Sequence, residues 1–182
     1  MKKNYFIVAG ILAIMIAISI VIILFTKKEE SSIKSTDDIL AMLDEIYKDT
    51  DLPTLENHVM DVTDKETVKT FTGITSDIEA LVVSEPLMNA QAYSLIVVKV
   101  KEEKDVEKIK QEIYDNINMN KWICVSADKL YITNNGDIIF AVMSSEDRAK
   151  PVYEKFKEYV NNKVGKELEK DNAGGMNGFI VE

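Results

Sequence analysis

The chain has 182 residues, 46% of them hydrophobic and 29% charged, so it can form one domain with additional segments and is too apolar to be disordered throughout. A net charge of −9 argues against a nucleic-acid-binding protein, because phosphate contacts require a basic surface. A disulfide framework is excluded, because Cys124 has no partner cysteine in the chain.

The first predicted element is a membrane-spanning helix at residues 5–25. This segment contains no charged residue, and its 21 residues give a helix of roughly 30 Å, the thickness of the hydrocarbon core. A cleaved signal peptide would end at small residues, whereas this segment ends in large apolar ones that lead directly into Thr26 and two lysines. We therefore expect residues 1–28 to be an uncleaved membrane anchor that contacts the lipid bilayer through residues 5–25, and residues 29–36 to be a linker.

The orientation of this anchor is predicted from the lengths of the chain on its two sides. Lysines lie on both sides of the apolar segment, so their distribution does not choose an orientation. The amino-terminal arm is short, while long domains translocate largely regardless of charge, so we expect the amino terminus in the cytoplasm and the C-terminal domain outside the cell. Residues 1–28 hold four lysines and no acid, so the remainder carries −13 against −9 for the whole chain. An anionic membrane surface repels such a domain.

Two helices are predicted next, the first of them amphipathic. Apolar residues recur every three or four positions over residues 36–48, and Ser35 with Asp38 resembles a capping box at the start of this helix. A second, short helix is predicted to begin after Thr63, with Glu66 completing another capping box, and to end near Gly73.

The rest of the domain combines strands, which are rich in β-branched residues, with amphipathic helices. The predicted elements are strands at 78–84 and 92–101, a helix at 103–118, strands at 130–133 and 138–143, and a helix that Ser144 or Ser145 caps and that runs to about Lys163. The Asn-Gly pair at Asn135 predicts a hairpin between the last two strands. Pro151 is compatible with the last helix only in its first turn. Residues 164–182 are predicted to be a flexible tail.

This order predicts an α+β fold. After the transmembrane helix, residues 37–163 are expected to form a two-layer extracytoplasmic domain with a β-β-α-β-β-α core. Its antiparallel four-stranded sheet is predicted to carry the helices on one face.

Residues 97–110 and 132–144 contain a strand, a lysine-rich turn, a helix and a later hairpin. In these features the chain resembles a Firmicutes family of uncharacterised extracytoplasmic proteins with a domain of unknown function, many of which look like lipoproteins or anchored proteins. The resemblance covers residues 37–160 and implies the location and the fold, but no catalytic residue. No lipidation cysteine follows the apolar segment, so the helix itself would be the anchor.

Histidine and cysteine chemistry finds little support in the sequence. His58 is the only histidine, and no nucleophile motif accompanies it and Asp61, so we expect a structural or surface histidine. The apolar neighbours of Cys124 would raise its pKa, so we expect a buried, unreactive thiol. One histidine and one cysteine do not suffice for a typical zinc site.

The acidic and glycine-containing segments give no site either. Asp49 and Asp51, and likewise residues 134–137, do not match the twelve-residue calcium loop, and we expect ordinary turns. Glu102 and Glu103 are typical of a solvated helix start. No glycine-rich phosphate loop is present in the sequence. We therefore expect no catalytic, cofactor-binding or metal-binding residues, and no cofactor.

The leading hypothesis is a non-enzymatic binding or scaffolding domain at the bacterial cell envelope, whose partner is an unknown envelope protein or ligand at a sheet face or edge. The alternative is a cell-wall hydrolase or transferase that uses carboxylates such as Asp61, Asp64 and Glu66. A third hypothesis is a passive component of a membrane complex, in which small residues of the transmembrane helix contact another helix. These residues are Ala9, Gly10, Ala13 and Ala17.

Overall fold

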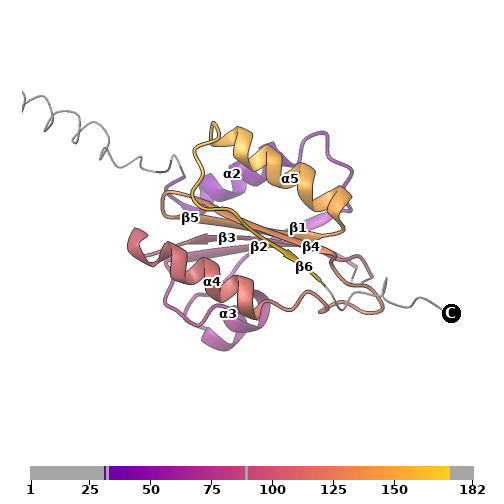
Figure 1. Cartoon of the computed structure of the whole chain (residues 1–182), viewed down its shortest axis with the longest axis horizontal. Helices are drawn as coiled ribbons and strands as arrows, with labels where there is room; N and C mark the ends of the chain where they lie inside the picture. The colour runs from indigo at the N-terminus through magenta and orange to yellow at the C-terminus, as the bar shows by residue number, and fades with distance from the viewer. Residues whose placement is uncertain (1–30, 32, 89, 173–182) are drawn as a thin grey trace, which may run out of the picture. The chain divides into compact units, whose positions relative to one another are not determined.

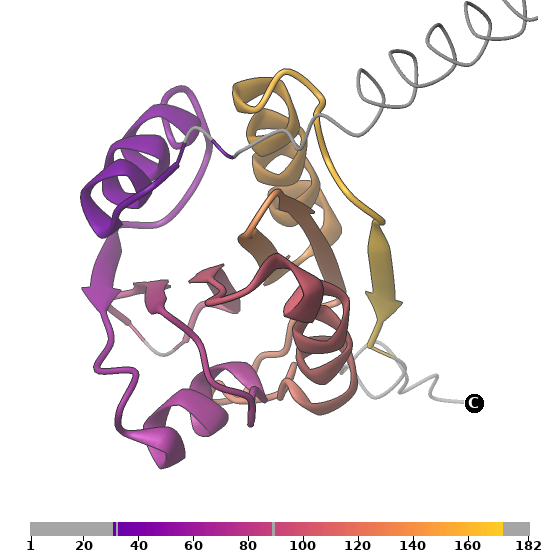
Figure 2. The ribbon, with the colours of Figure 1, turned by 90° about the vertical axis from the view of Figure 1, so that its left-hand side faces the viewer.

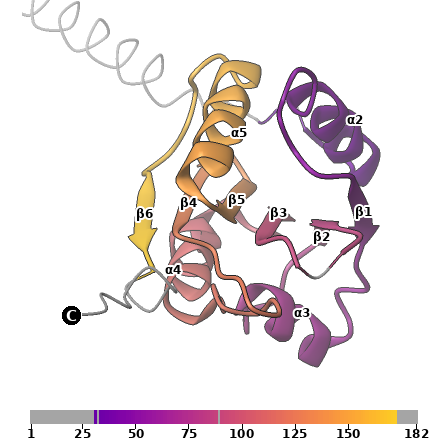
Figure 3. The same cartoon turned by 90° about the vertical axis from the view of Figure 1, so that its right-hand side faces the viewer.

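The computed structural model describes residues 31, 33–88 and 90–172, which form an antiparallel sheet of six strands between two layers of helices (Figure 1). The strands are β1 (Leu55–Val59), β2 (Ala80–Pro86), β3 (Tyr93–Lys99), β4 (Lys129–Asn135), β5 (Ile138–Ser144) and β6 (Leu168–Asp171). Their order across the sheet is β1-β2-β3-β5-β4-β6, as Figure 3 shows from one edge to the other.

The predicted transmembrane helix at residues 5–25 lies outside the described residues. In the part of the chain that the structure describes, no helix combines the length and the apolar character needed to cross a bilayer.

Helices cover both faces of the sheet, so the prediction that they lie on one face is wrong (Figures 1 and 2). Helices α2 (Thr36–Ile46) and α5 (Glu146–Tyr159) cover one face, while α3 (Lys65–Thr72) and α4 (Val106–Asn116), which follows the 3₁₀ turn η1 (Glu103–Asp105), cover the other. The reason lies in the central strand β3. Leu95 and Val97 point to α2 and α5, Ile96 and Val98 point to α3 and α4, and all four are buried. A strand that is apolar on both sides needs cover on both sides.

The four predicted strands are present as β2 to β5, and the four predicted helices are present as α2 to α5. The hairpin at Asn135 is also confirmed, because β4 and β5 pair up to Asn135 and Ile138. Gly136 follows Asn135 in this turn with a φ of 56°, a conformation that glycine adopts without strain.

The two edge strands, β1 and β6, are absent from the prediction, so four strands is an undercount. Strand β1 pairs with β2, and β6 pairs with β4. The flexible tail predicted for residues 164–182 is therefore wrong for Leu168–Asp171, while residues 173–182 lie outside the described residues. Both edge strands are short and rich in polar residues, so they lack the apolar alternation that predicts a strand.

The N-cap of α3 and the place of Pro151 in α5 differ from the prediction. Asp64 is the N-cap of α3 and its side chain accepts from the amide of Thr67, so the cap is not Thr63. In α5 the N-cap is Ser145, one of the two predicted residues, but Pro151 is the sixth residue of the helix, beyond the first turn. Proline at that position removes one helical hydrogen bond. Pro151 is exposed, so the carbonyl that loses its donor lies on the side of the helix that solvent reaches.

Candidate functional site

A cavity of about 430 Å³ lies beside the edge strand β1. Its volume falls within the range of roughly 300 to 1,000 Å³ that is usual for ligand sites. Strand β1 and the residues after it, helix α3 and strand β2 all contribute to its walls. The lining residues are His58, Val59, Met60, Asp61, Phe71, Val83 and Glu85.

The strand register explains why side chains from β1 and β2 meet here. His58 lies opposite Val83, whose side chain belongs to the core beneath α3 and α4. Glu85 follows two positions later on β2, so it shares that face of the sheet. The side chains of His58 and Glu85 therefore line the same side of the β1–β2 pair.

Glu85, which lines the cavity, belongs to a polar cluster with Ser94 and Lys121. Lys121 Nζ donates to Glu85 Oε1, and it lies 3.1 Å from Ser94 Oγ. Ser94 Oγ in turn donates to the same Glu85 oxygen at 2.9 Å. Both contacts use Oε1, and no hydrogen bond from a described residue reaches Oε2.

Two aromatic rings lie near the Lys121 ammonium group. Lys121 Nζ lies 5.4 Å from the ring centroid of Phe71 and 5.4 Å from that of Trp122. Burial lowers the pKa of Lys121 below its ordinary value, although the charge and hydrogen bond of Glu85 oppose this effect. Ser94 is completely buried, so it contributes to the structure of the cluster rather than to contact with a ligand.

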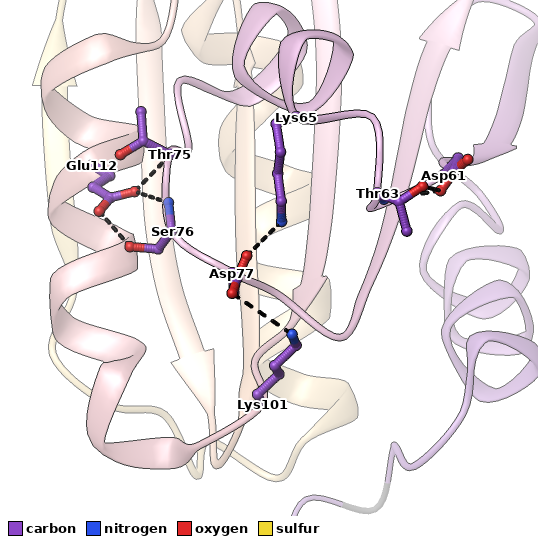
Figure 4. A network of polar contacts seen from close by, with 8 residues as sticks. All are labelled: Asp61, Thr63, Lys65, Thr75, Ser76, Asp77, Lys101 and Glu112. Atoms are coloured by element: carbon purple, nitrogen blue, oxygen red, sulfur yellow. Dashed lines mark hydrogen bonds and ion pairs between the residues drawn. The ribbon is translucent and has the colours of Figure 1, made fainter.

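The two predicted residues in the cavity, His58 and Asp61, lie at its rim. His58 is about half exposed, at 49% of its side-chain area, and its Nε2 lies 3.7 Å from Glu56 Oε2. His58 therefore lies at the surface, which is one of the two environments that the sequence predicts for it. Asp61 Oδ1 accepts from the Thr63 hydroxyl at 2.7 Å and from the Thr63 amide at 2.9 Å (Figure 4). These bonds lower the pKa of Asp61.

The carboxylates of the hydrolase alternative have local structural roles. Asp64 accepts from the Thr67 hydroxyl at 2.7 Å and from the Thr67 amide at 3.1 Å, and these bonds lower its pKa. Glu66 is exposed in the first turn of α3. A general acid near neutral pH needs a raised pKa, whereas Asp61 and Asp64 are held in their ionised form.

Cys124 does not lie where the sequence predicts. It is exposed and has a φ of 61°, so the expectation of a buried thiol is wrong. The neighbouring Ile123 is also 66% exposed, while Trp122 is buried. The loop therefore turns outward after Trp122. Its apolar composition does not predict this turn.

The predicted turns contain no metal-binding cluster. Asn134 and Asn135 donate their side-chain amides to the carbonyls of Gly136 and Lys163, at 3.0 and 2.7 Å. Asp49 has a φ of 56°, as befits a turn residue at the end of α2. Within residues 31, 33–88 and 90–172, no group of three or more histidine, cysteine, aspartate or glutamate side chains is placed to hold a metal ion.

Sequence reasoning missed Phe71, Glu85, Ser94 and Lys121. Lys121 is 36 residues from Glu85 in the chain, and only the sheet register and the loop after α4 bring them together. The one local signal is a lysine next to the single tryptophan, which is too weak to indicate a site.

Comparison with known families also draws attention to this region. Residues 53–122 match the model of a domain of unknown function, DUF4358. The match begins just before β1 and ends at Trp122, so it contains every residue that lines the cavity, and Lys121. No curated protein and no solved structure matches the chain.

The match confirms in part the resemblance drawn from the sequence. The match to the DUF4358 model covers residues 53–122, a shorter stretch than 37–160. Membership of a Firmicutes family of anchored proteins stays a prediction. Two other cavities, of about 400 Å³ at the ends of α2 and α5 and about 270 Å³ beside β6, are lined by residues outside the DUF4358 match.

Proposed function

We propose that this chain is a single-pass membrane protein of the bacterial cell envelope whose extracytoplasmic domain binds a polypeptide partner without chemical reaction. The partner adds as an extended strand to β1, next to the cavity. The observation that carries this proposal is the combination of a sheet edge and a cavity of about 430 Å³ within the DUF4358 match.

Strand β1 has backbone groups directed away from the sheet. The Met60 amide donates to the Leu81 carbonyl at 2.9 Å, which continues the β1–β2 ladder. In an antiparallel pair, alternate residues direct both backbone groups toward the partner strand. Asn57 and Val59 are out of phase with Met60, so their amides and carbonyls face away from β2. These are the groups that strand addition uses.

The geometry supports binding better than catalysis. The ionised, locally bonded Asp61 and Asp64 suit helix and turn formation, and Ser94 is inaccessible despite its lysine neighbour. No specific observation favours the alternative of a carboxylate-dependent hydrolase or transferase.

Proline substitution on β1 tests strand addition. The full-length protein in detergent micelles would be used to select binders from a phage-displayed peptide library. The expected binders protect the amides of Asn57 and Val59 from hydrogen exchange. Val59→Pro removes an outward-facing amide and leaves the ladder groups of His58 intact, so it should abolish binding and preserve the fold. Binding that survives Val59→Pro would contradict the proposal.

The membrane location has its own test. Residues 5–25 are apolar enough to span, and the acidic remainder of the chain suits a domain that stands off the bilayer. An epitope after Glu182 should be removed by protease treatment of intact cells, and the protein should resist extraction by alkaline carbonate. An epitope protected until lysis would reverse the proposed orientation.

A further inference from the structure

We infer that the cavity beside β1 accepts a basic side chain, arginine or lysine, from the strand that adds to β1. This inference rests on the proposed function, because it names the side chain that a polypeptide partner places there. Basic side chains combine a long apolar stem with a cationic end. The cavity offers surfaces for both parts.

The apolar walls suit the stem. Val59, Met60, Phe71 and Val83 line the cavity. Phe71 contributes an aromatic surface to these walls, and Lys121 Nζ lies 5.4 Å from its ring centroid. These side chains can pack against the methylene groups of a long basic side chain.

The polar groups of the cavity are acceptors. Glu85 is 21% exposed, and its Oε2 receives no hydrogen bond from the described residues, since Lys121 and Ser94 both bind Oε1. Asp61 likewise uses Oδ1 for both of its hydrogen bonds with Thr63. A guanidinium or ammonium group could donate to these carboxylates in charge-assisted hydrogen bonds, which are stronger than neutral ones.

The charge balance favours a cation. Lys121 neutralises Glu85, which leaves Asp61 and the exposed Glu56 as the uncompensated charges near His58. An acidic side chain would meet these carboxylates without a counter-charge. The same field opposes an aspartate or glutamate from a partner strand.

The register identifies the position of the basic residue. Residues that face each other across a strand pair place their side chains on the same side of the sheet. The residue of the added strand opposite His58 therefore directs its side chain toward the cavity, and its neighbours direct theirs toward α2.

The experiment uses the full-length protein in detergent micelles and two pairs of probes. One pair is a capped five-residue peptide with arginine between two valines on each side, and the same peptide with neutral citrulline in place of arginine. The other pair is butylguanidinium and the neutral butylurea. His58 is the only histidine of the chain, so its ring resonances report on the cavity without overlap.

The arginine peptide should bind at least about tenfold more tightly than the citrulline peptide, as expected for a charge-assisted bond in place of a neutral one. Butylguanidinium, but not butylurea, should shift the His58 resonances. Glu85→Gln should remove the preference for arginine. Because this change also removes the carboxylate that pairs with Lys121, Asp61→Asn provides a second variant that does not touch Lys121, and it should weaken the preference. The exposed Glu169→Gln, on β6 at the other sheet edge, is the matched control and should change nothing.

Equal affinity for the arginine and citrulline peptides would overturn the inference and leave strand addition intact. A His58 shift with butylguanidinium, without protection of the Asn57 and Val59 amides by either peptide, would support the cavity assignment and reject strand addition. No response of His58 to butylguanidinium together with no arginine preference would also overturn the inference.

Discussion

Lys110 Nζ lies 2.9 Å from Asn134 Oδ1, and no part of the lysine side chain is exposed. The same ammonium group donates to Glu107 Oε1 at 2.7 Å and to the Lys166 carbonyl at 2.5 Å. A buried ammonium group needs such acceptors, because transfer out of water is costly. Lys110 thereby joins α4, β4 and the segment that leads into β6.

Replacement of Lys110 by methionine should lower the free energy of unfolding by about 1 to 3 kcal/mol, because it leaves the buried Asn134 Oδ1 without its donor and removes the bonds to Glu107 and Lys166. Chemical denaturation measures this loss, and hydrogen exchange should show faster opening at Leu168–Asp171. Lys104→Met is the control, since Lys104 is exposed and pairs only at the surface with Glu102, 2.6 Å away. It should leave the denaturation midpoint unchanged. Equal effects of the two substitutions would show that the buried cluster does not hold this segment.

Gly165 is a second element of the same junction. Its amide donates to the Asn134 carbonyl at 2.7 Å, and a Cβ at this position would lie 2.8 Å from Asn134 Cγ. Gly165→Ala should therefore displace the Asn134 side chain that accepts from Lys110, at a cost of about 1 to 3 kcal/mol. Lys166→Ala keeps the carbonyl that Lys110 uses and should cost little.

The two changes should be coupled. Once Lys110 is methionine, displacement of Asn134 breaks no further bond to an ammonium group, so Gly165→Ala should cost less in that background. A double-mutant cycle should give a coupling energy above about 0.5 kcal/mol. Strict additivity would show that the clash at Gly165 is relieved without movement of Asn134.

Hydrogen bonds of Glu112 link α4 to the segment between α3 and β2. Its carboxylate accepts from the amides of Thr75 and Ser76 at 2.8 and 3.0 Å, and from the Ser76 hydroxyl at 2.6 Å (Figure 4). Asp77, also in this segment, lies between Lys65 and Lys101, at 2.7 and 3.9 Å. Partial burial raises the pKa of Glu112, but the hydrogen bonds from Ser76 and Thr75 outweigh it and lower the pKa below its ordinary value.

The lowered pKa of Glu112 makes the stability of the protein depend on pH. A carboxyl group with a lowered pKa in the folded state contributes stability above its unfolded pKa, about 4.3, and loses this contribution as the pH falls through the folded pKa. Glu112→Gln should therefore destabilise the protein by about 1 to 3 kcal/mol at pH 7, and the difference from the wild type should shrink toward zero as the pH falls below about 4. A difference that stays constant with pH would mean that shape, not charge, is responsible.

The elements that bury apolar residues could be predicted from the sequence, and the edge strands could not. The stripe of Val106, Ile109 and Ile113 and the alternation in β3 report burial directly, so α4 and the central strands could be predicted. An edge strand such as β1 buries little, so its sequence carries little signal. The two-sided cover was implied by β3 itself, whose buried residues leave no face free.

The candidate site was only partly visible in the sequence. His58 and Asp61 attract attention by residue type, and both lie at the cavity. Glu85 and Lys121 do not, because their environment depends on strand register and on a loop that sends Lys121 inward and Cys124 outward. Contacts between residues far apart in the chain have no local pattern from which to predict them.

Substitutions of Asp64 distinguish a helix-capping role of this residue from a catalytic one. An N-cap needs a side-chain acceptor for the Thr67 amide, and asparagine provides one nearly as well as aspartate. Asp64→Asn should therefore leave the melting temperature close to that of the wild type, whereas Asp64→Ala should lower it by about 3 °C. The thermal transition of each full-length variant, followed by circular dichroism, measures both changes.

If Asp64 were a catalytic carboxylate, the asparagine variant would be as impaired as the alanine variant in any turnover of cell-wall material, because an amide can neither donate nor accept the proton. Retained stability together with lost turnover in Asp64→Asn would therefore favour the hydrolase alternative over the binding domain.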